Sequence, residues 1–500
     1  MMSSVKPLLL RFALPEKRFF IYDTLTNMFF EVDRTIFDIL EFYKTLPENE
    51  IIDKLQAVHS REVLEKSLEI IKEQERTRGL FSDTRATCMS FVHDDSSFMD
   101  RYNNTCGQII LEVIQNCNLR CKYCTYSGHY SYQRLHNQKE MSWETAKAGV
   151  DWFVKASRDN ENKAVTFYGG EPLLRFDLIK KVIDYAKQQG MEFFHSFTTN
   201  GTLLGNREII DFLAMNKVSM LVSLDGPAGV HDKYRVFANG KPTHAVIMEN
   251  LERIYRLYPE YYSSSVNCIS TITYKSDIPE VFDFFTRDHG FPLSLGRLSN
   301  VDAMDTDFYK VYGEDTSGEE NPYIILFEKY RQMLLKQAGE IVGDYDREAS
   351  ILHKLFDEDF IAIHKRCMHR HREMHMNGCC IPGQRRVFVE TDGTMHACEK
   401  ISNKYPLGNV HSGGFDLNRV KDFIEGYIKV SFKDCRECPI QRVCRLCFRF
   451  AMKDGIMTAE RKREMCKAHI NEIENSLGHY IRLKAANDSV FSFIDHMQIT

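Results

Sequence analysis

The chain has 500 residues, of which 43% are apolar and 27% are charged, and its formal net charge is −5. A chain of this length folds into about two to four domains, and this composition excludes a mainly disordered or collagen-like protein. The small net charge gives no reason to expect a nucleic-acid partner. No apolar run approaches a membrane span and the N-terminus lacks the pattern of a signal peptide, so we expect a cytoplasmic protein without a membrane partner.

Residues 1–95 form the first predicted domain, with a winged-helix-like order of elements. Two strand-like runs cover 7–14 and 18–32, and the second contains a turn at Thr24–Asn27. Three helical patterns follow, and Asp33 is expected to cap the first. Nothing in this domain resembles a catalytic motif, so its predicted role is docking.

Residues 106–300 change to alternating strand-like and helical patterns. Helices are expected after Ser142 and over 176–190, where Gly190 is a C-terminal signal. Repeated βα units predict an α/β fold with a parallel sheet, open or closed into a barrel, whose active site lies at the carboxyl ends of the strands. The strand-like runs are 108–114, 164–168, 193–197 and 220–224.

The rest of the chain divides by composition into three further segments. Residues 301–366 are acidic and then helical, which indicates a connector. Residues 367–480 hold a second group of cysteines, and residues 481–500 form a C-terminal tail. Fifteen cysteines is a high number for a chain in a reducing compartment, where metal or cluster ligation is the usual alternative to disulfides.

Polar or thiol-bearing loops follow four of the predicted strands. Since the carboxyl ends of parallel strands meet at one edge of a sheet, these loops are expected to converge there. They are 117–124, Gly169–Pro172, Thr198–Gly201 and Leu224–Gly226.

The first of these loops, "CNLRCKYC", holds Cys117, Cys121 and Cys124. A [4Fe–4S] cluster normally takes four thiolates, so three leave one iron open to a ligand that is not protein. Zinc is the alternative, although a structural zinc site takes four ligands and commonly uses two CxxC pairs.

A CxxxCxxC motif after the first strand and a GGEP motif after a later one resemble the radical S-adenosylmethionine (SAM) enzymes. The resemblance implies a partial (β/α) barrel in which SAM chelates the open iron of a [4Fe–4S] cluster. In that family an electron from the cluster cleaves SAM, and the resulting 5′-deoxyadenosyl radical abstracts a substrate hydrogen. The protein positions and shields these cofactors.

The same resemblance implies roles for individual residues, each of which taken singly is also compatible with an ordinary turn or surface position. Cys117, Cys121 and Cys124 match the cluster ligands. The positions that match SAM contacts are Tyr123 beside the adenine, Gly169, Gly170, Glu171 and Pro172 at the amino group, Thr199 and Asn200 near the ribose, Ser223 and Asp225 at further polar atoms, and Arg235 at the carboxylate.

The second cysteine group resembles the SPASM domain, an Fe–S-binding C-terminal extension of peptide-modifying radical SAM enzymes. This resemblance implies two auxiliary [4Fe–4S] clusters. The family pattern has CX2CX5CX3C in its middle, whereas "CRECPIQRVCRLC" at 435–447 has only Arg445 and Leu446 in the last gap. The role of Cys447 is therefore left open.

The implied outer cluster has Cys435, Cys438, Cys444 and Cys466 as ligands. The implied inner cluster has Cys398, Cys447 and one of Cys379 and Cys380, and its fourth ligand is the other of that pair, Cys367 or the substrate. Zinc sites that use His369, His371 and His375 are the alternative. The remaining cysteines, Cys88, Cys106 and Cys268, are expected to be small buried hydrophobes.

The N-terminal domain resembles the leader-recognition domain of maturases that act on ribosomally made peptides. Such a domain binds the leader as an added strand. The nearest resemblance is to thioether-forming maturases of the ranthipeptide and sactipeptide type, which link a cysteine sulfur to a carbon of another residue. It implies a precursor peptide with a leader and a Cys-rich core as substrate, and a flavodoxin- or ferredoxin-like electron donor.

Three alternatives remain at this point. An anaerobic sulfatase-maturing enzyme forms formylglycine, but that group has an aspartate after the second SPASM cysteine and lacks a long N-terminal domain. This chain has Glu399 there, which is a candidate base and equally a candidate surface salt-bridge residue. A maturase that makes carbon–carbon or ether links is the second alternative, and a leader-binding metal scaffold without activity is the third.

Overall fold

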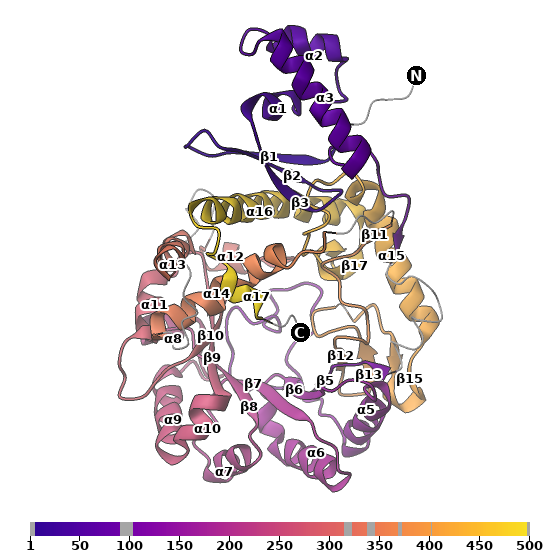
Figure 1. The fold of residues 1–500 in the computed structure, drawn as a ribbon. Coiled ribbons are helices and arrows are strands. Elements are labelled where there is room, and N and C mark those ends of the chain that lie inside the picture. The colour runs from indigo at the N-terminus through magenta and orange to yellow at the C-terminus, as the bar shows by residue number, and fades with distance from the viewer. Residues whose placement is uncertain are drawn as a thin grey trace.

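The computed structural model describes residues 6–90, 104–314, 323–337, 346–368, 373–401 and 403–497. Figure 1 shows a small N-terminal lobe above a curved sheet whose helices lie on the outside, with the C-terminal segments along one side of the sheet. In the described residues no helix is both long and apolar enough to cross a membrane.

The N-terminal lobe is an antiparallel sheet followed by three helices, as the sequence predicts. The strand order is β1-β2-β3, and the expected turn joins the last two strands. The Asp33 side chain accepts the Ile36 N–H at 2.9 Å and so caps the first helix. The predicted domain end at 95 lies outside the described residues. The elements are β1 (Leu9–Ala13), β2 (Phe19–Asp23), β3 (Met28–Val32), α1 (Arg34–Ile39), α2 (Glu48–Leu55) and α3 (Arg61–Arg78).

The central sheet contains six successive parallel strands in the order β10-β9-β8-β7-β6-β5. The strands β5, β6, β7 and β8 confirm the four runs predicted from sequence. The parallel sheet with helices on its outside confirms the predicted α/β fold with a partial barrel. The sequence analysis did not identify β9 and β10. The strands are β5 (Gln108–Ile114), β6 (Ala164–Gly169), β7 (Phe194–Thr199), β8 (Ser219–Ser223), β9 (Val266–Ile272) and β10 (Leu295–Asn300).

Amphipathic helices cover the outer face of this sheet (Figure 1). Ser142 caps α5 by accepting the Thr145 N–H at 3.1 Å, and Gly190 follows α6 with φ of 66°. Val150 and Phe153 of α5 and Ile179 of α6 are fully buried against the strands. These helices are α5 (Trp143–Ala156), η1 (Pro172–Arg175), α6 (Phe176–Gln188), α7 (Arg207–Met215), α8 (Ala228–Tyr234), α9 (His244–Leu257), α10 (Pro259–Ser265) and α11 (Ile278–Thr286).

The sheet continues into the C-terminal cysteine-rich part, which the sequence did not predict. Strand β12 (Val387–Val389) pairs in parallel with β5, and three short antiparallel strands extend the sheet beyond it. Those strands are β13 (Thr394–His396), β14 (Gly408–Asn409) and β15 (Gly414–Phe415).

The connector and the C-terminal part are mostly helical. The connector contains α12 (Phe308–Val311), α13 (Tyr323–Gln337) and α14 (Arg347–His364), and the later helices are η2 (Val410–Ser412), α15 (Leu417–Cys435), η3 (Phe448–Ala451), α16 (Ala459–Ala486) and α17 (Ser492–Asp495). Two small ribbons complete the fold, namely β4 (Met89–Ser90) with β11 (Met374–His375) and β16 (Met452–Lys453) with β17 (Ile456–Met457).

The N-terminal lobe packs on α16 and on the cysteine-rich part. Phe29 of β3 stacks on Tyr480 of α16 with ring centroids 5.7 Å apart, and Arg366 lies over the same Phe29 ring. The Asn27 side chain also donates to the Cys367 carbonyl at 2.9 Å. The lobe therefore has a fixed position beside the predicted auxiliary-cluster region.

Candidate cofactor site

A cavity at the carboxyl ends of β5 to β8 collects the loops that sequence analysis singled out. All three thiols of the first cysteine motif line it, together with residues from the loops after β6 and β7. The lining includes Cys117, Cys121, Tyr123, Cys124, Gly169, Gly170, Thr199, Asn200, Ser223 and Arg235, but not Glu171, Pro172 or Asp225.

Backbone and amide groups point at two of the three thiols. The Leu119 N–H donates to the Cys117 sulfur at 3.4 Å, and the Asn200 amide donates to it at 3.8 Å. The Tyr126 N–H donates to the Cys124 sulfur at 3.4 Å. Such N–H donors tune thiolates that ligate an iron–sulfur cluster, so the donor set fits one.

Burial raises the pKa of the Cys117 thiol to about 11, and the nearby charge of Glu171 adds to the effect. Burial likewise raises the pKa of Cys121 to about 12, while the positive charge of Arg235 opposes it. The pocket therefore keeps these thiols protonated unless a strong electrophile such as iron replaces the proton.

The two glycines of the GGEP motif allow the loop after β6 to press against the strand that carries the cysteines. A Cβ at Gly169, whose φ is 147°, would lie 2.0 Å from the Ile114 carbonyl oxygen. A Cβ at Gly170 would lie 2.0 Å from the Asn116 carbonyl oxygen. Only glycine fits at either position without moving backbone.

Glu171 lies behind the cavity wall rather than in it. Its carboxylate accepts hydrogen bonds from the Thr199 hydroxyl at 2.7 Å, the Asn200 N–H at 2.7 Å and the Leu173 N–H at 3.1 Å. The carboxylate therefore joins two loops of the cavity, and its predicted position near the SAM amino group stays a prediction. Pro172 begins η1 and also lies outside the lining.

Tyr123, Asp225 and Arg235 form one buried network. The Tyr123 hydroxyl donates to Asp225 at 2.5 Å and accepts from the Arg235 Nη1 at 2.7 Å. Asp225 also accepts the Thr271 N–H at 3.0 Å, so each of its carboxylate oxygens has a partner within the protein. Arg235 is 7% exposed and its Nε has no hydrogen-bond partner among the described residues. A carboxylate ligand in the cavity would satisfy this donor, which fits SAM.

Sequence analysis missed two aromatic residues of the cavity wall, Tyr126 and Tyr168. The Arg134 guanidinium lies 3.7 Å from the centroid of the Tyr126 ring. Tyr168 makes an edge contact with Phe388 of β12 at 5.9 Å between ring centroids. The sequence signal for Tyr126 is its position two residues after Cys124, and the signal for Tyr168 is its position directly before Gly169.

Glu399 lies on the C-terminal side of this wall. Its carboxylate pairs with the Arg386 Nη1 at 3.3 Å, and its side chain is 13% exposed. Burial raises the pKa of Tyr168, and the charge of Glu399 adds to this shift, so the two side chains are near each other. Glu399 itself does not line the first cavity, whereas Tyr168 does.

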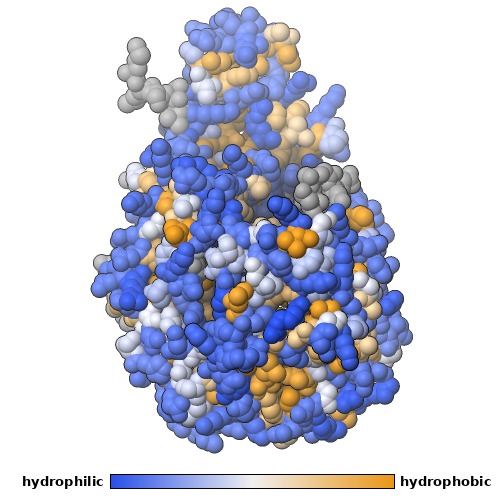
Figure 2. All heavy atoms as spheres, turned by 180° about the vertical axis from the view of Figure 1, so that it is seen from behind, coloured by the Kyte–Doolittle hydropathy of each residue, from blue (hydrophilic) through white to orange (hydrophobic). Residues whose placement is uncertain are grey.

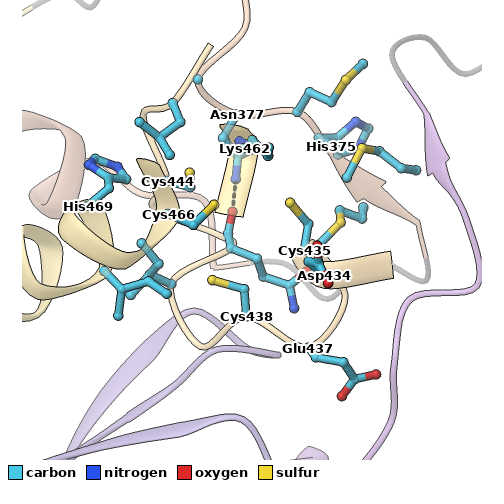
Figure 3. A pocket seen from close by; sticks show the side chains of 18 of the residues that line it. His375, Asn377, Asp434, Cys435, Glu437, Cys438, Cys444, Lys462, Cys466 and His469 are labelled. Carbon is cyan, nitrogen blue, oxygen red and sulfur yellow. Dashed lines mark hydrogen bonds between the residues drawn. The ribbon is translucent and has the colours of Figure 1, made fainter. Parts of the chain in front are cut away.

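The four thiols assigned to an outer cluster line a second cavity, of about 200 Å³ (Figure 3). Cys435 ends α15, Cys466 lies on α16, and Cys438 and Cys444 lie on the loop between them. Each of the four thiols is partly buried. A closed set of four such thiols matches the ligand number of a [4Fe–4S] cluster.

The thiols assigned to an inner cluster are also neighbours. The charge of Cys447 contributes to the raised pKa of Cys379 and of Cys398, in both cases after burial as the larger cause. The charge of Cys380 similarly adds to the burial that raises the pKa of Cys447. Cys367 is exposed.

The remaining cysteines and the three histidines lie in different environments. Cys106 and Cys268 are buried as expected, but Cys88 is exposed, so its expected burial is wrong. His369 and His371 lie outside the described residues, and His375 lines the second cavity. Within the described ranges no three His, Cys, Asp or Glu side chains are arranged to hold a single metal ion.

Comparisons with known proteins agree with this geometry. Residues 111–284 match the family described as the Radical SAM superfamily. The chain is 27% identical over 352 residues to a cysteine-type anaerobic sulfatase-maturating enzyme of Clostridium novyi (strain NT), covering 68% of this chain and 86% of that protein. It is 31% identical over 134 residues to the radical SAM cyclopropyl synthase TigE of Paramaledivibacter caminithermalis, covering 25% of this chain and 28% of that protein.

One solved structure shows the same fold. It is native anSMEcpe with bound AdoMet and Cp18Cys peptide, which has a TM-score of 0.52 at 20% identity and matches 76% of this chain and 99% of that chain.

Proposed function

We propose, from the match of residues 111–284 to the Radical SAM superfamily, that the chain is a radical SAM enzyme. In this proposal it matures a ribosomally made, cysteine-containing peptide by forming thioether links. The observation that supports this best is the pairing of β5 with β12. That pairing joins the three-thiol cavity and the cysteine-rich part in one sheet. We place the reaction in the cytoplasm.

The bound cluster and SAM supply the 5′-deoxyadenosyl radical that takes a hydrogen from a substrate carbon. In the proposal Cys117, Cys121 and Cys124 hold the cluster, and Arg235 binds the SAM carboxylate. Tyr126 and Tyr168 wall the cavity and exclude water from the reacting carbon.

We assign the auxiliary clusters to the two thiol groups of the C-terminal part. Cys435, Cys438, Cys444 and Cys466 hold the outer one, and Cys379, Cys380, Cys398 and Cys447 surround the inner one. A flavodoxin- or ferredoxin-like protein supplies electrons to the enzyme.

Glu399 is the proposed base that accepts the thiol proton of the substrate cysteine. Each thioether link removes two hydrogens from the peptide, one as an atom to the deoxyadenosyl radical and one as this proton. The one electron left over when the thiolate bonds to the carbon radical would leave through the proposed auxiliary clusters. Arg386 pairs with the Glu399 carboxylate at 3.3 Å, and Tyr168 of the cavity wall lies near it. Because a base must lie within reach of the proton it removes, the proposal requires the substrate thiol to enter beside Tyr168.

The N-terminal lobe is the proposed leader-binding domain. Among the described residues neither β1 nor β3 pairs with another strand at its outer edge, so the sheet has room for an added strand. Figure 2 shows apolar groups on this lobe within a mostly hydrophilic surface. Its exposed large apolar residues are Val58, Val63 and Ile70.

Formylglycine formation is a second candidate because the relatives include sulfatase-maturating enzymes. Two observations favour the thioether proposal over it. The N-terminal lobe resembles a leader-recognition domain, and the position after Cys398 carries glutamate instead of aspartate. Carbon–carbon and ether links remain the other products to be tested.

The deciding experiment incubates the anaerobically reconstituted enzyme with SAM, a reductant and each short Cys-containing peptide that the neighbouring open reading frames are found to encode. The expected product has lost two hydrogens per link, keeps all its sulfur, and no longer alkylates at the linked cysteines. A product that has lost sulfur identifies the formylglycine reaction instead. The Cys121→Ala variant is the control and should form no 5′-deoxyadenosine.

A further inference from the structure

Lys462 is a buried lysine in the wall of the four-cysteine cavity (Figure 3). Its exposed fraction is 1%, which is rare for a lysine. Lys462 precedes Cys466 by one turn of α16, so the two side chains lie on the same face of that helix.

A buried ammonium requires a negative partner, because removal of a charge from water costs several kcal/mol. Within the described ranges Lys462 makes no ion pair with a carboxylate. The nearby Asp434 carboxylate pairs instead with Arg463 at 2.8 Å. The Lys462 ammonium lies 5.2 Å from the centroid of the Tyr427 ring, a contact that supplies only part of the missing stabilisation.

Lys462 shares the wall of this cavity with all four thiols of the outer group. On its other side the Tyr427 ring separates it from the inner group. The Tyr427 hydroxyl donates to the Leu446 carbonyl at 3.3 Å, and the Cys379 thiol approaches the same carbonyl at 3.9 Å. Leu446 directly precedes Cys447, so Lys462 lies beside the outer thiols and one aromatic ring from the inner ones.

We propose that Lys462 is the fixed counter-charge of the two auxiliary clusters and raises their reduction potentials. This inference rests on the auxiliary clusters of the proposed function. A [4Fe–4S] cluster with four thiolate ligands is an anion, and its reduction adds a further negative charge. A cation held in a dry site nearby stabilises the reduced form more than the oxidised form. In this proposal the Lys462 ammonium acts on the clusters through its charge and does not touch the peptide.

The test uses the full-length holoenzyme and compares Lys462→Met, which keeps length and removes charge, with Lys462→Arg, which keeps charge. Lys467→Met is the matched control, because Lys467 is exposed on the same helix. Iron and sulfide are counted per chain, and the reduction midpoints of the auxiliary clusters are measured by potentiometric titration monitored by electron paramagnetic resonance.

We expect Lys462→Met to titrate at lower potential than the unchanged protein, or to lose auxiliary-cluster iron that Lys462→Arg retains. Lys462→Arg and Lys467→Met should titrate close to the unchanged protein. Equal midpoints for Lys462→Met and the unchanged protein would overturn the inference, as would equal loss of iron in both Lys462 variants. If the unchanged protein holds only about four irons, the auxiliary clusters themselves are refuted before any variant is compared.

Discussion

The Glu171 carboxylate accepts the backbone N–H of Asn200 at 2.7 Å and so ties the loop after β6 to the loop after β7. The Thr199 hydroxyl donates to the same carboxylate. Because both loops supply walls of the three-thiol cavity, the shape of that cavity depends on this buried carboxylate.

We expect Glu171→Gln to destabilise the protein by about 1–3 kcal/mol, because one of its buried donors loses its acceptor. SAM binding should weaken while the iron of the first cluster is retained. Equilibrium dialysis with SAM and thermal unfolding measure the two effects. Glu249→Gln, at an exposed ion pair with Arg253, is the control and should change neither value. Unchanged SAM affinity in Glu171→Gln would contradict the claim that this carboxylate determines the shape of the cavity.

Gly170→Ala should abolish the close approach between the GGEP loop and the cysteine loop. The added Cβ would lie 2.0 Å from the Asn116 carbonyl oxygen, so one of the two backbone segments must move. We expect a loss of first-cluster iron, measured per chain, together with a lower melting temperature. Gly229→Ala in α8 is the control, since nothing lies within 4 Å of its Cβ. Full iron content in Gly170→Ala would show that the loops do not depend on each other.

Glu399→Gln should separate the two halves of the proposed reaction. Removal of the base is expected to slow peptide crosslinking by about 10²–10⁴-fold, while 5′-deoxyadenosine still forms. Liquid chromatography of the nucleoside and mass spectrometry of the peptide quantify both products in one reaction. The exposed Glu425→Gln substitution serves as the comparison. Crosslinking at the unchanged rate would assign Glu399 to its ion pair with Arg386 alone.

His195 on β7 makes the fold sensitive to acid. Burial lowers the pKa of His195 to about 4, and the charge of Lys187 adds to the shift. Its folded pKa lies below the unfolded value of about 6.5, so protonation of the unfolded chain removes stability as the pH falls below about 6.5. The resulting decrease in the free energy of unfolding is about 1.4 kcal/mol at pH 5.5.

His195→Phe should therefore reduce the drop in melting temperature between pH 7.5 and pH 5.5. The new ring would lie between Phe167 and Phe193, which already contact the imidazole. His496→Phe, at an exposed site, is the comparison. An equal drop in His195→Phe and the unchanged protein would locate the acid sensitivity elsewhere.

Long apolar runs made most of the central sheet predictable. The strand β5, "QIILEVI", is almost wholly buried, and its composition alone indicates that position. The two strands that were missed carry weaker signals. In β9, "VNCISTI", three of the seven residues are polar, and β10, "LGRLSN", contains only two apolar residues. The pairing of β12 with β5 joins segments far apart in the chain, and no local pattern encodes such a contact.

The cysteine motifs predicted which residues come together, but they did not predict how these are held. Asp225 is predicted to contact SAM, but the motif gave no sign that its carboxylate also binds Tyr123 and the Thr271 N–H. Lys462 lies in the charged sequence "AERKREMC", which is typical of an exposed helix. Its burial follows from the packing of α16 against α15 and the cysteine loop, which a sequence pattern does not contain.

The pairing of β12 with β5 also determines how the barrel behaves without the C-terminal part of the chain. A chain that ends before Val387 leaves the outer N–H and C=O groups of Ile109 to Leu111 without a partner strand. A bare edge of this kind recruits strands from other molecules. The barrel is therefore expected to aggregate when it is produced alone. In the full chain, the segment from Val387 onward covers this strand edge and so prevents such association.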